Sequence, residues 1–341
     1  MLETRYRDKS YLSKYDLSIE LFKKFNLRVN DVVPLRNVYI LSTDKGEKVF
    51  KKIDYSLEDL EFIHGALKQI KNNFKRVIDF ALNKDGKPYT KWNKDIYCVM
   101  DLVPGRECDF NNLIDLSIAS KGLGELHKAA VDVDKTFLRK NAVGKLIDTF
   151  KRKLLELELF RSIAQMHEYK TDFDNIFLEN FCYYTEQIKE SIEFLEHSPY
   201  RELCEEEKNI AFCHHDLAYH NIIINEEEAY FIDFDFAVVD LKIHDICNLM
   251  NKAIKNFAFD MERAESIIEN YNCTNSLEEK ELKVLYGMLL FPEDFYSISK
   301  DYYTRRKDWE EDVFLYRLIK KVSYKEERSE FLEDYKEKFT S

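Results

Sequence analysis

Residues 212–236 read FCHHDLAYHNIIINEEEAYFIDFDF, which places clustered polar side chains around two short apolar runs. The runs are joined by an Asn-Glu-Glu-Glu segment, and this combination predicts a β-hairpin. Asp216 and Asn221 precede the hairpin, and Asp233 is expected on its second strand. Because side chains alternate along a strand, Asp233 and Asp235 should share one face. The stretch therefore predicts two carboxylates and one carboxamide side by side on a rigid support.

This set of side chains suits phosphoryl transfer. That reaction needs Mg²⁺ on the phosphates and one carboxylate that orients the acceptor hydroxyl and accepts its proton. Mg²⁺ prefers hard oxygen ligands and usually takes one or two carboxylates together with substrate phosphates. We therefore predict Asp216 as the base and Asn221 and Asp233 as the metal ligands. The alternative is a polar turn between two core strands, with its acids in water.

Composition limits the class of protein. With 341 residues and 45% hydrophobic residues, the chain is long enough for two lobes and apolar enough to fold. Its formal charge of −12 argues against a nucleic-acid partner. The N-terminus has no apolar signal-peptide core and no uncharged run reaches membrane-spanning length, so we expect a cytosolic chain that does not enter a membrane. The seven scattered cysteines are expected to be reduced thiols, and no structural metal site is expected.

Apolar periodicity and turn residues predict a small antiparallel sheet followed by a helical region. We expect a helix within residues 10–30 and a second helix from Ser56, with Ser56 as its cap. Strands are expected at 32–41, 48–53, 77–82 and 96–100. Long amphipathic segments after residue 110 predict helices with aromatic cores.

The spacing His214-x-Asp216-x-x-x-x-Asn221, followed after twelve residues by Asp233, resembles the catalytic and metal-binding loops of the protein-kinase-like superfamily. Several further segments together look like the CotS-type spore-coat kinase-like proteins of the aminoglycoside and choline phosphotransferase superfamily. These segments are Phe62–Gly65, Val103–Arg106, Leu290–Pro292 and Asp301–Tyr303.

The resemblance covers nearly the whole chain and implies a bilobal α+β fold. It places an N-lobe at residues 1–101, a hinge at 102–106 and a helical C-lobe at 107–341. It also implies ATP and Mg²⁺ as cofactors, a hydroxyl compound as acceptor, and contact with other spore-coat proteins after synthesis in the cytosol.

The resemblance assigns further site residues. Val49-Phe50-Lys51 matches the strand whose lysine contacts the nucleotide phosphates, so Lys51 is the candidate. Either Glu58 or Glu61 on the following helix is expected to form the ion pair that positions Lys51, and we prefer Glu61. The backbone of Met100, Asp101 and Leu102 is expected to bind the adenine edge. Asp245 matches an acidic position that braces the catalytic loop.

Two departures from the family pattern keep other functions open. No glycine lies between Pro34 and Thr43, where backbone amides would cradle the phosphates, and Ala218 replaces a family histidine. The alternatives are a catalytically weak or inactive structural coat protein and a nucleotide-sensing module without turnover. The acidic composition weakly favours a cationic acceptor, and the aromatic residues 296–303 are candidates for a wall of the acceptor pocket.

Overall fold

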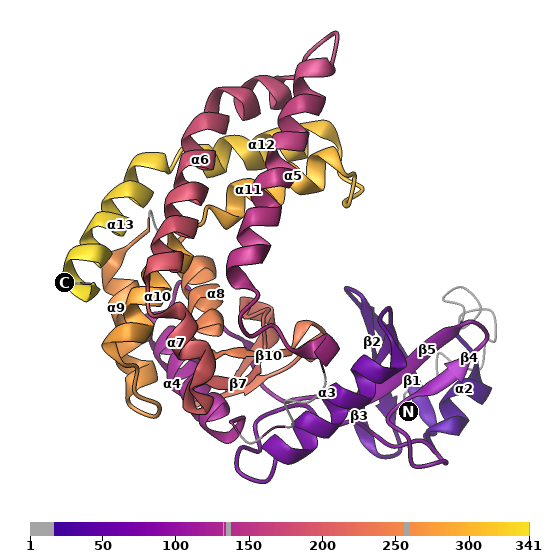
Figure 1. Cartoon of the computed structure of the whole chain (residues 1–341). Helices are drawn as coiled ribbons and strands as arrows, with labels where there is room; N and C mark the ends of the chain where they lie inside the picture. The colour runs from indigo at the N-terminus through magenta and orange to yellow at the C-terminus, as the bar shows by residue number, and fades with distance from the viewer. Residues whose placement is uncertain (1–16, 132, 134–137, 256–258, 341) are drawn as a thin grey trace.

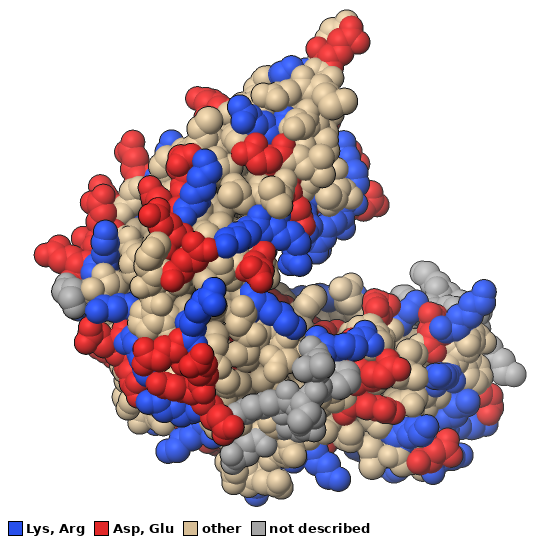
Figure 2. Space-filling model, viewed as in Figure 1, with Lys and Arg blue, Asp and Glu red and all other residues tan. Residues whose placement is uncertain are grey.

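The structure, a computed structural model, describes residues 17–131, 133, 138–255 and 259–340. A small sheet domain and a large helical arm meet along one side, with helix α3 between them (Figure 1). The space-filling view shows a hollow that opens between the arm and the sheet domain (Figure 2). This is the bilobal α+β architecture that the sequence predicted.

The N-lobe is a five-stranded antiparallel sheet in the order β1-β2-β3-β5-β4. Its elements are α2 (Ile19–Lys24), β1 (Val29–Leu35), β2 (Val38–Thr43), β3 (Gly46–Ile53), α3 (Leu57–Ile70), β4 (Thr90–Trp92) and β5 (Asp95–Asp101). Alternation along β3 sends Phe50 into an apolar cluster with Phe22 and Tyr97 beside α2. The next residue, Lys51, therefore points to the opposite face.

The sequence prediction was wrong in two places in this lobe. The expected single strand at 32–41 is a hairpin, because Arg36 adopts φ of 52° and turns the chain between Leu35 and Val38. The expected strand at 77–82 contributes only isolated bridges from Val77 and Phe80, and β4 takes the edge position. The helix near the N-terminus is confirmed only as the short α2, and residues 1–16 lie outside the described part.

The C-lobe contains two small sheets, β7 with β10 and β6 with β8 and β9, surrounded by helices. Its helices are α4 (Leu113–Ala129), α5 (Leu146–Met166), α6 (Asp172–His197), α7 (Tyr200–Glu205), α8 (Lys242–Ile254), α9 (Met261–Asn272), α10 (Glu279–Leu289), α11 (Glu293–Tyr303), α12 (Glu311–Val322) and α13 (Lys325–Phe339). Its strands are β6 (Arg106–Glu107), β7 (Ile210–Cys213), β8 (Ile222–Asn225), β9 (Glu228–Phe231) and β10 (Val238–Leu241). Short 3₁₀ turns are η1 (Leu138–Lys140), η2 (Glu207–Asn209), η3 (Tyr219–Asn221) and η4 (Phe234–Phe236). None of the described helices combines the length and the apolar character that crossing a membrane requires.

The chain passes from one lobe to the other between Asp101, the last residue of β5, and Arg106, the first of β6. Gly105 has φ of 131°, and a Cβ there would lie 2.6 Å from the carbonyl oxygen of Ile224. Only glycine permits this close approach to β8. We propose residues 102–106 as the hinge between an N-lobe that ends at 101 and a C-lobe that begins at 107.

Candidate active site

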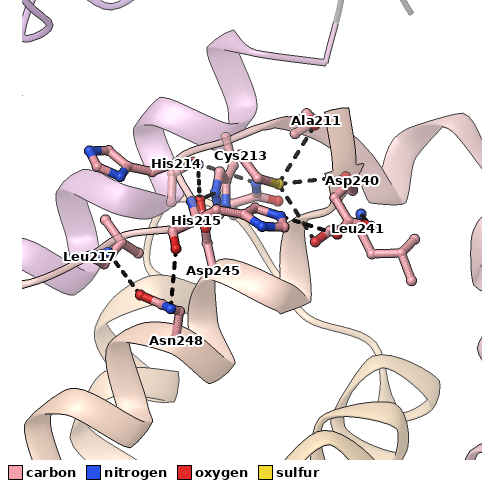
Figure 3. A network of polar contacts seen from close by, with 12 residues as sticks. Ala211, Cys213, His214, His215, Leu217, Asp240, Leu241, Asp245 and Asn248 are labelled. Carbon is pink, nitrogen blue, oxygen red and sulfur yellow. Dashed lines mark hydrogen bonds and ion pairs between the residues drawn. The ribbon is translucent and has the colours of Figure 1, made fainter. Parts of the chain in front are cut away.

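The loop after β7 is held from below by helix α8 (Figure 3). The Asp245 carboxylate accepts hydrogen bonds from the backbone N–H of His214 at 2.6 Å and of His215 at 2.8 Å. One turn later, Asn248 Oδ1 accepts the N–H of Leu217 at 2.8 Å. These bonds fix a turn in which His215 has φ of 62°. Asp245 thus braces the loop that carries Asp216, as the resemblance implied.

Asp245 is fully buried and also accepts a hydrogen bond from His127 Nε2 at 3.0 Å. Burial is the largest single influence and would raise the pKa of the Asp245 carboxyl, but the His127 hydrogen bond and the charge interactions with His127, His215 and His214 together hold that pKa well below its usual range. His127 in turn contacts the Tyr271 hydroxyl at 2.9 Å. The carboxylate is thus a charged, fully bonded support for the loop, and His127 is a buried, hydrogen-bonded core residue.

Asp216 lies on the braced loop next to Asn221. Asn221 Nδ2 donates to Asp216 Oδ2 at 3.0 Å and to the Asp216 carbonyl at 2.9 Å. The other carboxylate oxygen accepts a hydrogen bond from Lys252 Nζ of α8. Burial raises the pKa of Asp216, but the hydrogen bond and charge of Lys252, together with His214 and His220, lower it by more in total. Asp216 therefore stays ionised at neutral pH.

Sequence reasoning did not identify Lys252. The signal was present, because Asp245, Asn248 and Lys252 recur at helical spacing along one side of α8. Each of the three contacts a different part of the catalytic loop.

Asp233 follows β9 and does not lie on a strand, which corrects the sequence prediction. It adopts a left-handed conformation with φ of 62° and ψ of 63° just before η4. The N–H of Ile232 donates to the Asn221 carbonyl at 3.0 Å, so Asp233 comes directly beside Asn221. The three predicted residues, Asp216, Asn221 and Asp233, are therefore brought together.

Lys51 reaches this group from the N-lobe. Its Nζ lies 2.6 Å from Asp233 Oδ1 and 2.6 Å from Asp235 Oδ2. Burial lowers the pKa of Lys51, but the two carboxylates, Asp235 first, raise it above its ordinary value. Burial raises the pKa of Asp235, although Lys51 opposes the shift. Asp233 and Asp235 were predicted to lie on the same face of a strand. In the structure they are instead brought together by a common partner, Lys51.

The expected ion pair between Lys51 and Glu61 is not what the structure shows. Glu61 accepts a hydrogen bond from the Tyr89 hydroxyl at 3.3 Å, and Glu58 lies 3.7 Å from Arg139. The physical reason is that the Lys51 side chain extends toward the two carboxylates after β9. Asp235, which Tyr55 and Lys140 also contact, is the partner that sequence reasoning missed.

The predicted adenine-binding backbone runs along β5 and into the connector. The N–H of Asp101 donates to the Asp79 carbonyl at 3.1 Å, and the N–H of Leu102 donates to the Glu47 carbonyl at 3.3 Å. Both donors are therefore engaged within the protein. The Met100 side chain is buried and lines the same enclosed cavity as Lys51.

That enclosed cavity has a volume of about 10 Å³, which is about the room of one water molecule. Cys98, fully buried, also lines it, and burial raises the pKa of the Cys98 thiol to about 12. A nucleotide base in this place requires the two lobes or their side chains to move apart.

The residues present fit a magnesium ion. Asn221 uses its amide nitrogen on Asp216, which leaves the amide oxygen as a hard ligand. Asp233 supplies a carboxylate whose side chain is 43% exposed, and Asp235 stands beside it. One amide oxygen and one or two carboxylates form the donor set that Mg²⁺ takes together with substrate phosphates.

Comparisons with known proteins identify the family and the fold. A family model described as "Spore coat putative kinase YutH" matches residues 18–335. Spore coat protein S of Bacillus subtilis (strain 168) is 24% identical over 308 residues, which cover 87% of this chain and 86% of that protein.

Two solved structures share the fold. An aminoglycoside phosphotransferase from Alicyclobacillus acidocaldarius has a TM-score of 0.82 at 17% identity, over 95% of this chain and 96% of that one. The amicoumacin kinase hAmiN, solved with AMP-PNP and Ca²⁺, has a TM-score of 0.62 at 15% identity, over 97% and 94% of the two chains. The predicted kinase-like fold is therefore confirmed, and since the family model spans nearly the whole chain, the protein belongs to the YutH family of spore-coat kinase-like proteins.

Proposed function

We propose that this protein transfers the γ-phosphoryl group of ATP to a hydroxyl group of a small molecule or of a spore-coat component. The observation that carries the proposal is the placement of Asp216, Asn221 and Asp233 around one point, on a loop that α8 holds rigid. A polar turn with solvated acids needs no such support. The family description and the name of the B. subtilis relative support a place in the spore coat.

In the proposed reaction Asp216 binds the acceptor hydroxyl and takes its proton as the hydroxyl oxygen bonds to the γ-phosphorus of ATP and the bond from that phosphorus to the departing ADP oxygen breaks. The lowered pKa keeps Asp216 ionised, so it acts by orienting the hydroxyl and accepting the proton late. Lys51 supplies positive charge for the phosphates when it leaves its two carboxylates. Mg²⁺, held by Asn221 and Asp233, would neutralise charge on the phosphate oxygens.

The alternative function is a structural coat protein that kept the fold and lost the reaction. Three features favour it. Lys51 is paired with Asp233 and Asp235, the backbone N–H groups of Asp101 and Leu102 are hydrogen-bonded within the protein, and the enclosed cavity is small. The same features are also expected of a resting enzyme whose lobes open when the nucleotide binds.

A thermal-shift titration with ATP, with and without Mg²⁺, distinguishes the kinase from the structural coat protein. Ligand binding at a hundredfold excess over Kd stabilises the native state by about 2.7 kcal/mol, which such a titration detects easily. We expect a Mg²⁺-dependent shift in the wild type that Asp233→Ala abolishes. Absence of a shift in both proteins would favour the structural function.

Transfer itself is tested with γ-labelled ATP and Asp216→Asn, which keeps the shape of the side chain and removes the base. We expect this variant to bind ATP with Mg²⁺ as the wild type does and to lose phosphate transfer. Transfer at wild-type rate would disprove the role of Asp216. Tight ATP binding without transfer in the wild type would identify a nucleotide-sensing module.

A further inference from the structure

A second pocket lies at the end of α8, between that helix and the helices α11 and α12. Its volume is about 580 Å³, which is within the range of small-molecule sites. Four of its lining residues are cationic and two are acidic. The cations are Lys255, Arg317, Lys320 and Lys321, and the acids are Asp294 and Asp312.

The pocket is connected to the proposed catalytic base by α8. Lys252, which donates to Asp216, lies three residues before Lys255, so the two lysines share a side of the helix. Lys255 Nζ contacts Asp294 at 3.4 Å, and Lys321 Nζ contacts the same oxygen at 3.0 Å. Asp216 and the pocket are thus linked through Lys252 and Lys255, which lie three residues apart on one side of α8.

The pocket carries more positive charge than its own acids neutralise. Asp294 is shared by Lys255 and Lys321, whereas Arg317 and Lys320 are exposed and form no ion pair within the described part of the chain. Arg317 lies over the Trp309 ring at 4.0 Å, which fixes its guanidinium at the pocket wall. Arg317 and Lys320 are therefore placed to receive an anionic group.

The titration of Lys321 supports the same conclusion. Burial is the main cause that lowers the pKa of Lys321, and the neighbouring cations Lys255 and Arg317 lower it further against the opposing effect of Asp294. Like charges that repel in this way are relieved by a bound anion. Lys and Arg also gather on the side of the helical arm that faces the hollow between the lobes (Figure 2).

We propose that the phosphoryl acceptor is an anionic hydroxyl compound, bound by its negatively charged group to Arg317 and Lys320, with its hydroxyl directed along α8 to Asp216. This inference rests on the proposed function, because it assigns the substrate class of the same site. It reverses the weak expectation of a cationic acceptor that the acidic composition gave. Pocket charge at this place is opposite in sign to the net charge of −12.

The test uses three sugars that share the glucose ring and differ in charge: glucose 6-phosphate, glucose and glucosamine. Each is titrated calorimetrically into the full chain at low salt. We expect the wild type to bind glucose 6-phosphate at least about tenfold more tightly than glucosamine, since a charge reversal in such a site is worth about that much or more. Equal or tighter binding of glucosamine, or no binding of any of the three, would overturn the proposal.

The pocket is verified with Arg317→Glu combined with Lys320→Glu, two exposed positions where substitution should leave the fold intact. The double variant should lose the preference for glucose 6-phosphate or invert it. The matched control is Lys336→Glu, an exposed lysine on α13 outside the pocket, which should retain the preference. An unchanged preference in the double variant would overturn the assignment of these residues.

The ATP titration on the same proteins separates this inference from the proposed function. If ATP binds with Mg²⁺ while the double variant behaves as the wild type toward the sugars, the anionic acceptor is disproved and the kinase proposal stands. If ATP never binds while glucose 6-phosphate binds through Arg317 and Lys320, the kinase proposal falls and the anion site stands.

Discussion

The two sides of the proposed site are built differently. On the C-lobe side, the loop after β7 rests on α8 through the buried Asp245 and the half-buried Asn248 and Lys252, and Asp245 alone bonds three groups. On the N-lobe side, the β1–β2 hairpin reaches the C-lobe through an exposed pair, Arg36 and Glu107, at 2.8 Å. Buried, fully bonded groups rigidify a structure, whereas exposed ion pairs contribute little. The proposed base is therefore held on a rigid support, whereas the β1–β2 hairpin contacts the C-lobe through a weak, exposed ion pair.

The largest effect is expected from removing the support of the loop. Asp245→Ala leaves two buried N–H groups and His127 without their acceptor, so it should lower the free energy of unfolding by about 3 kcal/mol or more. Urea unfolding measures this loss. Asp101→Ala, which removes the exposed partner of Lys48, is the control and should cost less than about 1 kcal/mol. Similar losses in both variants would contradict the comparison.

Mild acid should weaken the same braced side. Burial, with a smaller contribution from His215, lowers the pKa of His244 from 6.5 to about 4, and its ring stacks on His215 at 3.9 Å. The unfolded chain binds this proton near pH 6.5 and the folded chain only near pH 4. Stability is therefore full above pH 6.5 and falls by up to about 3 kcal/mol as the pH approaches 4.

Urea unfolding at several pH values between 7 and 4.5 tests this expectation. His244→Phe keeps a stacking ring and removes the titrating group, so its stability should vary less with pH over that range. If the variant and the wild type lose stability in parallel, His244 is not the cause.

An intermediate effect is expected where the two sides meet. Lys51→Met leaves Asp233 and Asp235 facing each other without their shared cation, and should cost about 1 to 3 kcal/mol, a value reduced for the partial exposure of Asp233. Thermal or urea unfolding measures the loss. The neighbouring Lys52→Met removes only an exposed pair with Asp95 and should leave stability unchanged. Equal effects would show that the Lys51 contacts add nothing to stability.

The smallest effect is expected at the β1–β2 turn. Arg36→Ala breaks the contact with Glu107 but keeps a side chain at positive φ, whereas Arg36→Gly also removes that strain. We expect Arg36→Ala to cost less than about 1 kcal/mol and Arg36→Gly to be the more stable of the two by about 1 kcal/mol. Urea unfolding of both variants tests this order. If the alanine variant were the more stable, strain at this turn would be ruled out.

The sequence predicted the catalytic-loop side better than the N-lobe side for a physical reason. Asp216, Asn221 and Asp233 belong to one short segment, so local spacing and hairpin geometry bring them together. The bracing role of Asp245 also came from a recognisable position. Lys252 was missed because its contact with Asp216 depends on how α8 packs under the loop, which is a tertiary fact.

The partner of Lys51 was harder to predict because it is set by how the lobes meet. The spacing of residues on a helix can favour Glu61 over Glu58, but it gives no information about Asp235. That residue lies 184 positions after Lys51 in the chain (235 − 51). The hairpin at Arg36 was missed because no glycine marks the turn. Local chemistry was thus predictable, and contacts between distant segments were not.

The buried thiol of Cys98 can report how often the two lobes separate. It lies in the enclosed cavity beside Lys51, and its raised pKa keeps it unreactive while the lobes are together. Cys182 and Cys273 are exposed and would be alkylated at once, which gives an internal standard in the same sample. The rate of Cys98 alkylation would then measure how often the N-lobe moves away from the C-lobe. ATP bound in the opened space should prevent this alkylation.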